Sequence, residues 1–281
     1  LISRYGTYGI QFVNSLFIAK FLGPFYLGIW GFATLIIQYL GQFHLGIAQS
    51  ANTIMAVNKD RKRYLENVLG SSFTMLLGWS ILVFICLMIL AYFGLGSKFY
   101  FQEYSLIVGV ISVLAYLNSS LFDIYRLNNL YFKIAVNQSL FVILCSISLF
   151  FFKGKDLLWA LLISNFLSFL FSFILFLIKS PIPVKLIFDL RLSKRIQSKG
   201  IYLYLYNSSF YLIMISIKSF VSSCYSVMEF GFFTFAFSMA NIGSLLLNSV
   251  AMIIYPKLLN RLANNTNDII FNILTVFRKA Y

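Results

Sequence analysis

The sequence predicts an all-α, polytopic membrane helix bundle. Eight hydrophobic stretches follow one another along the chain, and a helix needs about 20 mainly apolar residues to cross the hydrocarbon of a bilayer. The chain is 60% hydrophobic and 11% charged, whereas soluble domains carry about 25% charged residues. Long unbroken apolar runs also argue against the alternating pattern of a membrane β-barrel. Each backbone group in lipid must then be satisfied within its own helix.

Six of the eight predicted helices precede residue 179. Their approximate spans are 1–20, 27–50, 68–93, 104–125, 131–152 and 157–178. Gly23-Pro24 separates the first two helices, because proline fixes φ and has no backbone donor. Gly94 and Gly96 separate the third helix from the fourth.

A basic segment with two prolines follows, and two more helices are predicted over about 200–223 and 230–255. The chain therefore divides into three parts: an N-terminal lobe of six helices at 1–178, a basic linker at 179–199, and the start of a second lobe at 200–281. The linker could lie on the membrane surface as an amphipathic stretch, or it could be a solvated tether. In the first case its lipid-facing residues are Leu186, Ile187, Leu190 and Leu192.

Lysine and arginine set the predicted orientation. Sixteen of the 22 lie in segments on one side of the membrane and four on the other, while Arg4 and Lys218 lie within helices. Cytoplasmic loops carry an excess of these residues, so residues 56–66 and 179–199 are predicted to face the cytoplasm. Residues 94–102 and 153–156 are predicted to face outward. This bias also explains the net charge of +14, so no nucleic-acid partner is expected.

Four predicted helices carry polar side chains at three- and four-residue spacing, which places each set on one helix face. The sets are Arg4, Thr7, Gln11 and Asn14; Thr34, Gln38 and Gln42; Tyr204, Asn207, Tyr211 and Lys218; and Ser238, Asn241 and Asn248. Such faces can line a water-filled cavity between two lobes, or they can hydrogen-bond between helices and hold the bundle together. With Arg4 and Lys218 included, the sequence favours the cavity.

The candidate substrate-binding residues are those on these faces whose side chains are cationic, amide or phenolic. They are Arg4, Gln11, Asn14, Gln38, Asn207, Tyr211, Lys218 and Asn241. A cation suits an anionic solute, and amides both donate to and accept from hydroxyl groups. Arg4 and Lys218 could instead extend along their helices to the membrane interface.

Motifs for catalysis or cofactor binding are absent from the sequence. It has no Ser/His/Asp set, nucleotide loop or metal cluster, and Cys86, Cys145 and Cys224 lie in different hydrophobic stretches without C-x-x-C spacing. We therefore expect no enzyme activity, no cofactor and no metal.

A short internal similarity links residues 27–35 with residues 230–238. Gly28, Phe32 and Ala33 recur as Gly231, Phe235 and Ala236. Six helices separate the two copies, so a true repeat would be parallel and related by an axis along the membrane normal. Chance similarity between apolar segments is the alternative.

Three motifs resemble a known family in their order and spacing. They are Lys20-Phe-Leu-Gly-Pro-Phe-Tyr-Leu-Gly-Ile-Trp30, Glu229-Phe-Gly-Phe-Phe-Thr-Phe-Ala-Phe237 and Tyr255-Pro-Lys-Leu258. They look like the motifs of the Wzx-type O-antigen and polysaccharide flippases of the multidrug/oligosaccharidyl-lipid/polysaccharide (MOP) exporter superfamily. The chain departs from that family at Ile217-Lys218, where an Asp-Arg pair is usual.

The resemblance implies a two-lobed MOP-type transporter whose cavity is lined by the first, second, seventh and eighth helices. Because the chain begins at Leu1 and ends soon after Arg278-Lys279, we expect a fragment with a complete N-lobe and the first two helices of the C-lobe. The implied function is translocation of an undecaprenyl-pyrophosphate-linked oligosaccharide across the bacterial plasma (inner) membrane. The implied partners are this lipid-linked substrate and membrane lipids, with a polysaccharide polymerase and chain-length machinery as further candidates.

Other functions stay open from the sequence. Within the same superfamily these are a drug or cation antiporter and a peptidoglycan-precursor flippase. Outside it, a membrane glycosyltransferase or polymerase is the alternative. An ion-coupled antiporter would need a membrane-embedded carboxylate, and the four polar faces carry none.

Overall fold

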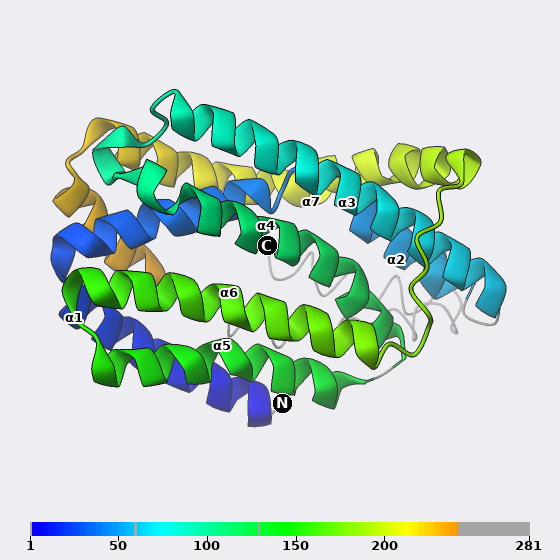
Figure 1. Cartoon of the computed structure of the whole chain (residues 1–281), viewed down its shortest axis with the longest axis horizontal. Coiled ribbons are helices and arrows are strands. Elements are labelled where there is room, and N and C mark those ends of the chain that lie inside the picture. Colours follow the sequence, from blue (N-terminus) through cyan, green and yellow to red (C-terminus); the bar gives the residue numbers. More distant parts are fainter. Residues whose placement is uncertain (1, 59–60, 129, 241–281) are drawn as a thin grey trace, which may run out of the picture.

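The computed structural model of the chain describes residues 2–58, 61–128 and 130–240 (Figure 1). Its elements are α1 (Ile2–Leu40), α2 (Ile47–Val57), α3 (Lys62–Tyr92), the 3₁₀ turn η1 (Ser97–Phe99), α4 (Phe101–Leu127), α5 (Tyr131–Phe151), α6 (Gly154–Ile178), α7 (Leu190–Cys224) and a last helix, Val227–Ala240. The described residues form helices, turns and irregular segments without a strand. The all-α prediction is confirmed.

The predicted break at Gly23-Pro24 divides α1 into two helical segments. Gly23 adopts φ 70° and ψ 169°, a conformation that is strained for any residue with a Cβ atom. Pro24 follows at the start of the second segment, where its missing donor is not needed. The two segments therefore point in different directions, and each meets different neighbours (Figure 1).

The predicted helix over 27–50 ends earlier than expected. It stops at Leu40, a turn follows, and α2 begins separately at Ile47. Leu45 and Gly46 have φ values of 47° and 74°, so the backbone turns through the left-handed region. At Gly46 the chain also touches α7: an added Cβ would lie 2.0 Å from the Gly200 carbonyl oxygen. Only glycine fits this contact.

The segment expected to be a linker is shorter than predicted, because α7 begins at Leu190 rather than near residue 200. The Asp189 side chain caps this helix by accepting from the backbone of Arg191 and Leu192. Leu192 is buried among residues of α2 and α3 and does not face lipid, whereas Leu186 is exposed.

The remaining part of the segment crosses α3 and packs on it. A Cβ on Gly70 would lie 2.4 Å from the Lys185 carbonyl oxygen, and the Lys185 ammonium pairs with Glu66 at 3.7 Å. Residues 179–189, which we call the strap, thus contact α3 at Gly70 and Glu66, while most of their side chains are exposed.

Two buried apolar clusters hold the helices together. One gathers α1, α4 and α6 around Phe32, Phe99 and Leu157. The other gathers α2, α3 and α4 around Leu69, Leu121 and neighbouring side chains. The helix α4 contributes to both clusters and packs mainly against α3 on one side and α6 on the other, with α5 beyond α6 (Figure 1).

The described residues include four helices that are long and apolar enough to cross a membrane. They are Gly9–Leu40, Lys62–Tyr92, Phe101–Phe122 and Gly154–Ile178; Ser139–Phe151, Tyr211–Cys224 and Val227–Ala240 are shorter apolar helices. On α3, Ile81, Ile85 and Ile89 are about half exposed on one face, as expected for a helix side in contact with lipid. The chain is a multi-pass membrane protein.

Candidate functional site

The second segment of α1, together with the turn that follows it, makes a hydrogen-bonded contact with α7 that we call the polar seam. Its pairs are Lys218 Nζ to Gln38 Oε1 at 3.1 Å, Tyr39 Oη to Ser219 Oγ at 2.6 Å, and Ser208 Oγ to Gln42 Oε1 at 3.1 Å. Lys218 meets Gln38, Ser208 meets Gln42 and Gly200 meets Gly46, so the chain from α1 to α2 runs antiparallel to α7 here. Of these three pairs, Gln38–Lys218 is the one that joins residues from two predicted polar faces.

Lys218 is the charged residue of the polar seam. Its half-buried side chain donates to Gln38, and its ammonium lies 4.2 Å from the centre of the Phe237 ring, on the last described helix. A hydrogen bond to a charged group contributes about 1.5–3 kcal/mol, and a desolvated cation–π contact about 2 kcal/mol. Lys218 thus turns towards α1 and the last helix instead of extending to the membrane interface. Neither partner is an anion, so the positive charge is not neutralised by them.

Asn14 makes its contacts elsewhere. It is buried and donates to the Val142 carbonyl oxygen at 3.2 Å and to Ser146 Oγ at 2.9 Å, both on α5. This is the interhelical hydrogen bonding that the sequence left open as the alternative to a cavity. Asn14 is therefore not part of the polar seam.

The other candidate residues are not brought together by the described part of the structure. Gln11 is exposed on α1, and Tyr211 is 36% exposed on α7. Arg4 and Asn207 belong to α1 and α7, but their side chains lie outside the described structure, and Asn241 lies outside the described residues. Of the eight predicted site residues, Gln38 and Lys218 are the pair seen in contact. Their role in binding stays a prediction.

The two similar segments found in the sequence pack against each other. A Cβ on Gly28 would lie 2.1 Å from the Val227 carbonyl oxygen, and a Cβ on Gly231 would lie 2.0 Å from the Pro24 carbonyl oxygen. Val227 follows Pro24 by 203 residues, as Gly231 follows Gly28. The contact is thus reciprocal, as expected when two copies are related by a two-fold axis. This supports a parallel repeat over chance similarity.

Sequence reasoning missed several residues that shape the site. Tyr39 and Ser219 directly follow Gln38 and Lys218 but fall off the spacing that defined the polar faces. Phe237 carries no distinguishing signal, because 19% of the chain is aromatic. Lys98, in the α3–α4 connection, donates to the Ser222 carbonyl oxygen at 2.7 Å and to that of Tyr225.

Comparison with known proteins identifies relatives at the level of family and fold. The family described as "Polysaccharide biosynthesis protein" matches residues 1–260. A solved structure described as the inward-facing conformation of a multidrug resistance MATE family transporter of the MOP superfamily aligns with a TM-score of 0.65 and 17% sequence identity. That alignment covers 86% of this chain and 61% of the transporter chain, so this chain spans less than two thirds of its length. No curated protein matches. The helical bundle therefore has the fold of a MOP-superfamily transporter.

Proposed function

The chain belongs to the polysaccharide biosynthesis protein family, and from that premise we propose that it acts as a flippase for an undecaprenyl-pyrophosphate-linked oligosaccharide. The cargo would be an O-antigen or capsule repeat unit, and the membrane would be the bacterial plasma (inner) membrane. Family and fold support a flippase or exporter in polysaccharide biosynthesis. The lipid-linked cargo is the finer part of the proposal.

The observation that carries the proposal is the position of Lys218. Ionisable residues within membrane-spanning segments are costly and usually mark the path of a substrate or ion. Lys218 is held between α1 and the last helix by Gln38 and Phe237, neither of which cancels its charge. A pyrophosphate is a dianionic or more highly charged group, and a positive side chain inside the bundle would attract it.

The amide groups of the polar seam suit the sugar part of such a cargo. Gln38 and Gln42 accept hydrogen bonds from Lys218 and Ser208 through their Oε1 atoms, and each amide also carries two N–H donors. A sugar hydroxyl can take the place of Lys218 at Gln38 or of Ser208 at Gln42, independently at each amide. Several weak contacts of this kind allow release as well as binding. Arg4, Gln11, Asn207, Tyr211 and Asn241 stay in the proposal as further polar contacts.

The proposal also names partners. Besides the lipid-linked oligosaccharide and surrounding membrane lipids, a polymerase and its chain-length machinery would receive the translocated unit, because a flipped repeat unit must be consumed on the far side. No cofactor is needed for the contacts proposed here.

The test is complementation of a flippase-null strain with the full-length protein. Surface polysaccharide is measured against protein abundance on an immunoblot. Lys218→Ala and Arg4→Ala should lower surface polysaccharide at unchanged abundance, and Gln38→Ala should lower it less, since it removes one contact among several. Lys194→Ala is the matched control, because Lys194 is an exposed lysine on the same helix. Full polysaccharide from the Arg4→Ala, Lys218→Ala double variant would contradict the role of these cations.

A drug exporter is the second candidate, because the solved structure with this fold is that of a multidrug resistance transporter. The same strains are therefore tested for susceptibility to cationic drugs. Restored drug resistance without restored polysaccharide would favour the exporter over the flippase.

A further inference from the structure

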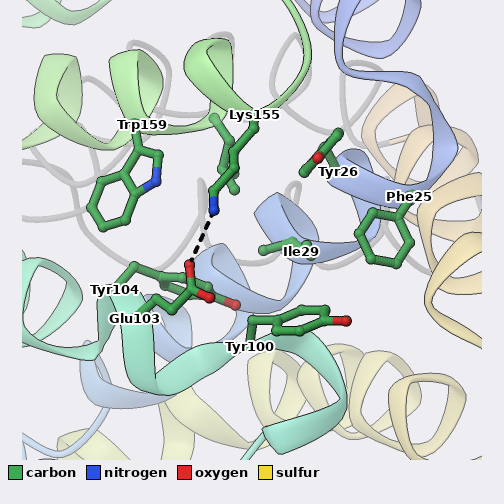
Figure 2. A pocket seen from close by; sticks show the side chains of 9 residues that line it. Phe25, Tyr26, Ile29, Tyr100, Glu103, Tyr104, Lys155 and Trp159 are labelled. Atoms are coloured by element: carbon green, nitrogen blue, oxygen red, sulfur yellow. Dashed lines mark ion pairs between the residues drawn. The ribbon is translucent and has the colours of Figure 1, made fainter.

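A pocket of about 190 Å³ opens at the end of the bundle where α4 and α6 begin (Figure 2). Its walls come from three separate parts of the chain. Tyr26 belongs to α1 and Tyr100 to the end of η1, while Glu103 and Tyr104 lie at the start of α4 and Lys155 and Trp159 at the start of α6. The pocket shares no residue with the polar seam.

Aromatic rings form most of the pocket wall. The Tyr104 ring is buried and its hydroxyl donates to the Phe99 carbonyl oxygen at 2.9 Å, which fixes that ring. Trp159 and Tyr26 are only half-buried, so part of each ring is open to a ligand. Aromatic faces attract weakly polarised C–H groups because the π system makes the face negative.

One ion pair faces this aromatic wall. The Lys155 ammonium and the Glu103 carboxylate point towards each other at 3.6 Å (Figure 2). Their side chains are 59% and 51% exposed, and an exposed ion pair contributes about 0–1 kcal/mol. A ligand can therefore separate the two groups at little cost. The pocket then offers it both a strong acceptor and a strong donor.

We propose that this pocket binds a single neutral sugar ring. A pyranose has an apolar C–H face that can lie on Trp159 or Tyr26, and hydroxyl groups at its edge that can donate to Glu103 and accept from Lys155. The volume is below the 300–1,000 Å³ of pockets for drug-sized ligands, which fits one ring better than a long glycan. The paired charges disfavour an isolated phosphate, since Glu103 repels it. These arguments do not depend on the flippase proposal.

A lipid headgroup is the rival occupant. Tryptophan and tyrosine are enriched where membrane proteins cross the headgroup region, and Lys155 could pair with a lipid phosphate. The two ligands differ in charge and in their hydroxyl content, so binding measurements can separate them.

The experiment uses the purified full-length protein in lauryldimethylamine oxide, a detergent without a sugar headgroup. Trp30→Phe and Trp79→Phe leave Trp159 as the reporter among the tryptophans of this chain. Its emission is followed during titration with methyl α-glucopyranoside, methyl α-galactopyranoside and N-acetylglucosamine. Parallel titrations use inorganic phosphate and glycerophosphoethanolamine, and saturation-transfer NMR detects the bound sugar directly. A saturable response to at least one sugar is expected, with none to phosphate.

Variants then assign the response to the pocket. Glu103→Gln keeps the shape but removes the charged acceptor, and it should weaken sugar binding by about three- to tenfold. Tyr26→Ala removes one of the two stacking surfaces and should weaken the response. Tyr92→Ala is the matched control, because Tyr92 is 81% exposed on α3, and it should leave binding unchanged. Circular dichroism checks folding, and Glu103→Gln alone decides the question if Tyr26→Ala misfolds.

Three outcomes overturn the inference: no sugar response, a response to glycerophosphoethanolamine in place of sugar, or sugar binding that survives Glu103→Gln unchanged. The second would identify a headgroup site. The binding assay does not involve transport. A negative binding result would therefore overturn the pocket proposal without contradicting the flippase proposal, and a negative complementation result would do the reverse.

Discussion

The lysines of this chain meet different kinds of partner. Lys218 is held by an amide and an aromatic ring inside the bundle, whereas Lys98 reaches the end of α7 and donates to the carbonyl oxygens of Ser222 and Tyr225. The last carbonyls of a helix lack partners within the helix and carry partial negative charge. A cation from another segment therefore both satisfies these carbonyls and ties the α3–α4 connection to α7.

Replacing Lys98 with methionine should lower the thermal stability of the protein. The variant keeps most of the side chain's length but loses the donor, and a cation at a helix C-terminus contributes about 1 kcal/mol. Melting temperatures in detergent micelles measure the effect. Lys194→Met, at an exposed lysine of α7, is expected to melt like the unmodified protein. Equal melting temperatures for the two variants would show that Lys98 does not hold the end of α7.

Two glycines, Gly28 and Gly231, allow two helices of the bundle to cross at a short distance. The second segment of α1 and the helix Val227–Ala240 approach until Gly28 meets Val227 and Gly231 meets Pro24. A side chain at either glycine would overlap a backbone carbonyl, which cannot rotate away. The same close contact brings Phe237 within reach of Lys218, so helix spacing and site geometry are linked.

Gly28→Ala should destabilise the protein by about 1–3 kcal/mol, the usual cost of overpacking. Gly78→Ala is the matched control on α3, where an added Cβ meets nothing within 4 Å. There the higher helix propensity of alanine should stabilise the protein by up to about 1 kcal/mol. Thermal unfolding of both variants makes the comparison. A Gly28→Ala variant as stable as Gly78→Ala would mean that the two helices do not cross at this distance.

At the scale of the whole molecule, segments predicted on the same side of the membrane lie together. Glu103 and Lys155, at the starts of α4 and α6, form an ion pair at 3.6 Å. Glu66 and Lys185 form another at 3.7 Å, where the strap crosses α3. The two pairs lie at opposite ends of the bundle (Figure 1). This arrangement agrees with the alternation of sides inferred from the charges.

Orientation itself can be tested with single cysteines in a background without Cys86, Cys145 and Cys224. In intact spheroplasts, an impermeant thiol reagent should label Ser97→Cys and Lys153→Cys but not Lys62→Cys or Lys194→Cys. Ser97 is used instead of Lys98 because Ser97 is exposed, whereas replacing Lys98 would remove its hydrogen bond to α7. After the membrane is permeabilised, all four should react. If Lys62→Cys alone were labelled before permeabilisation, the predicted orientation would be wrong and the chain would face the opposite way.

Most helices could be predicted because their boundaries are local features. The sequence predicts a helix over 131–152, and α5 is Tyr131–Phe151, because polar residues and a basic loop bound its apolar run. The end of α1 at Leu40 and the start of α7 at Leu190 were missed. After Leu40, the glycines of the sequence are compatible with either a continued helix or a turn. The close contact between Gly46 and Gly200 favours the turn. At the second, residues 190–199 are polar and basic overall, and burial of Leu192 and Ile196 beside α2 stabilises the helix.

By itself, the sequence determined that the chain is an α-helical, multi-pass membrane protein with polar residues on particular helix faces. These properties depend on the length of apolar runs and on a period of 3.6 residues, and both are local. Only the tertiary structure decided which neighbour each polar face meets. Asn14 and Gln38 have similar amide side chains on adjoining helical segments, yet Asn14 bonds to α5 and Gln38 to Lys218 of α7. Helical periodicity gives a residue's direction around its own axis, whereas its partner depends on how distant segments pack.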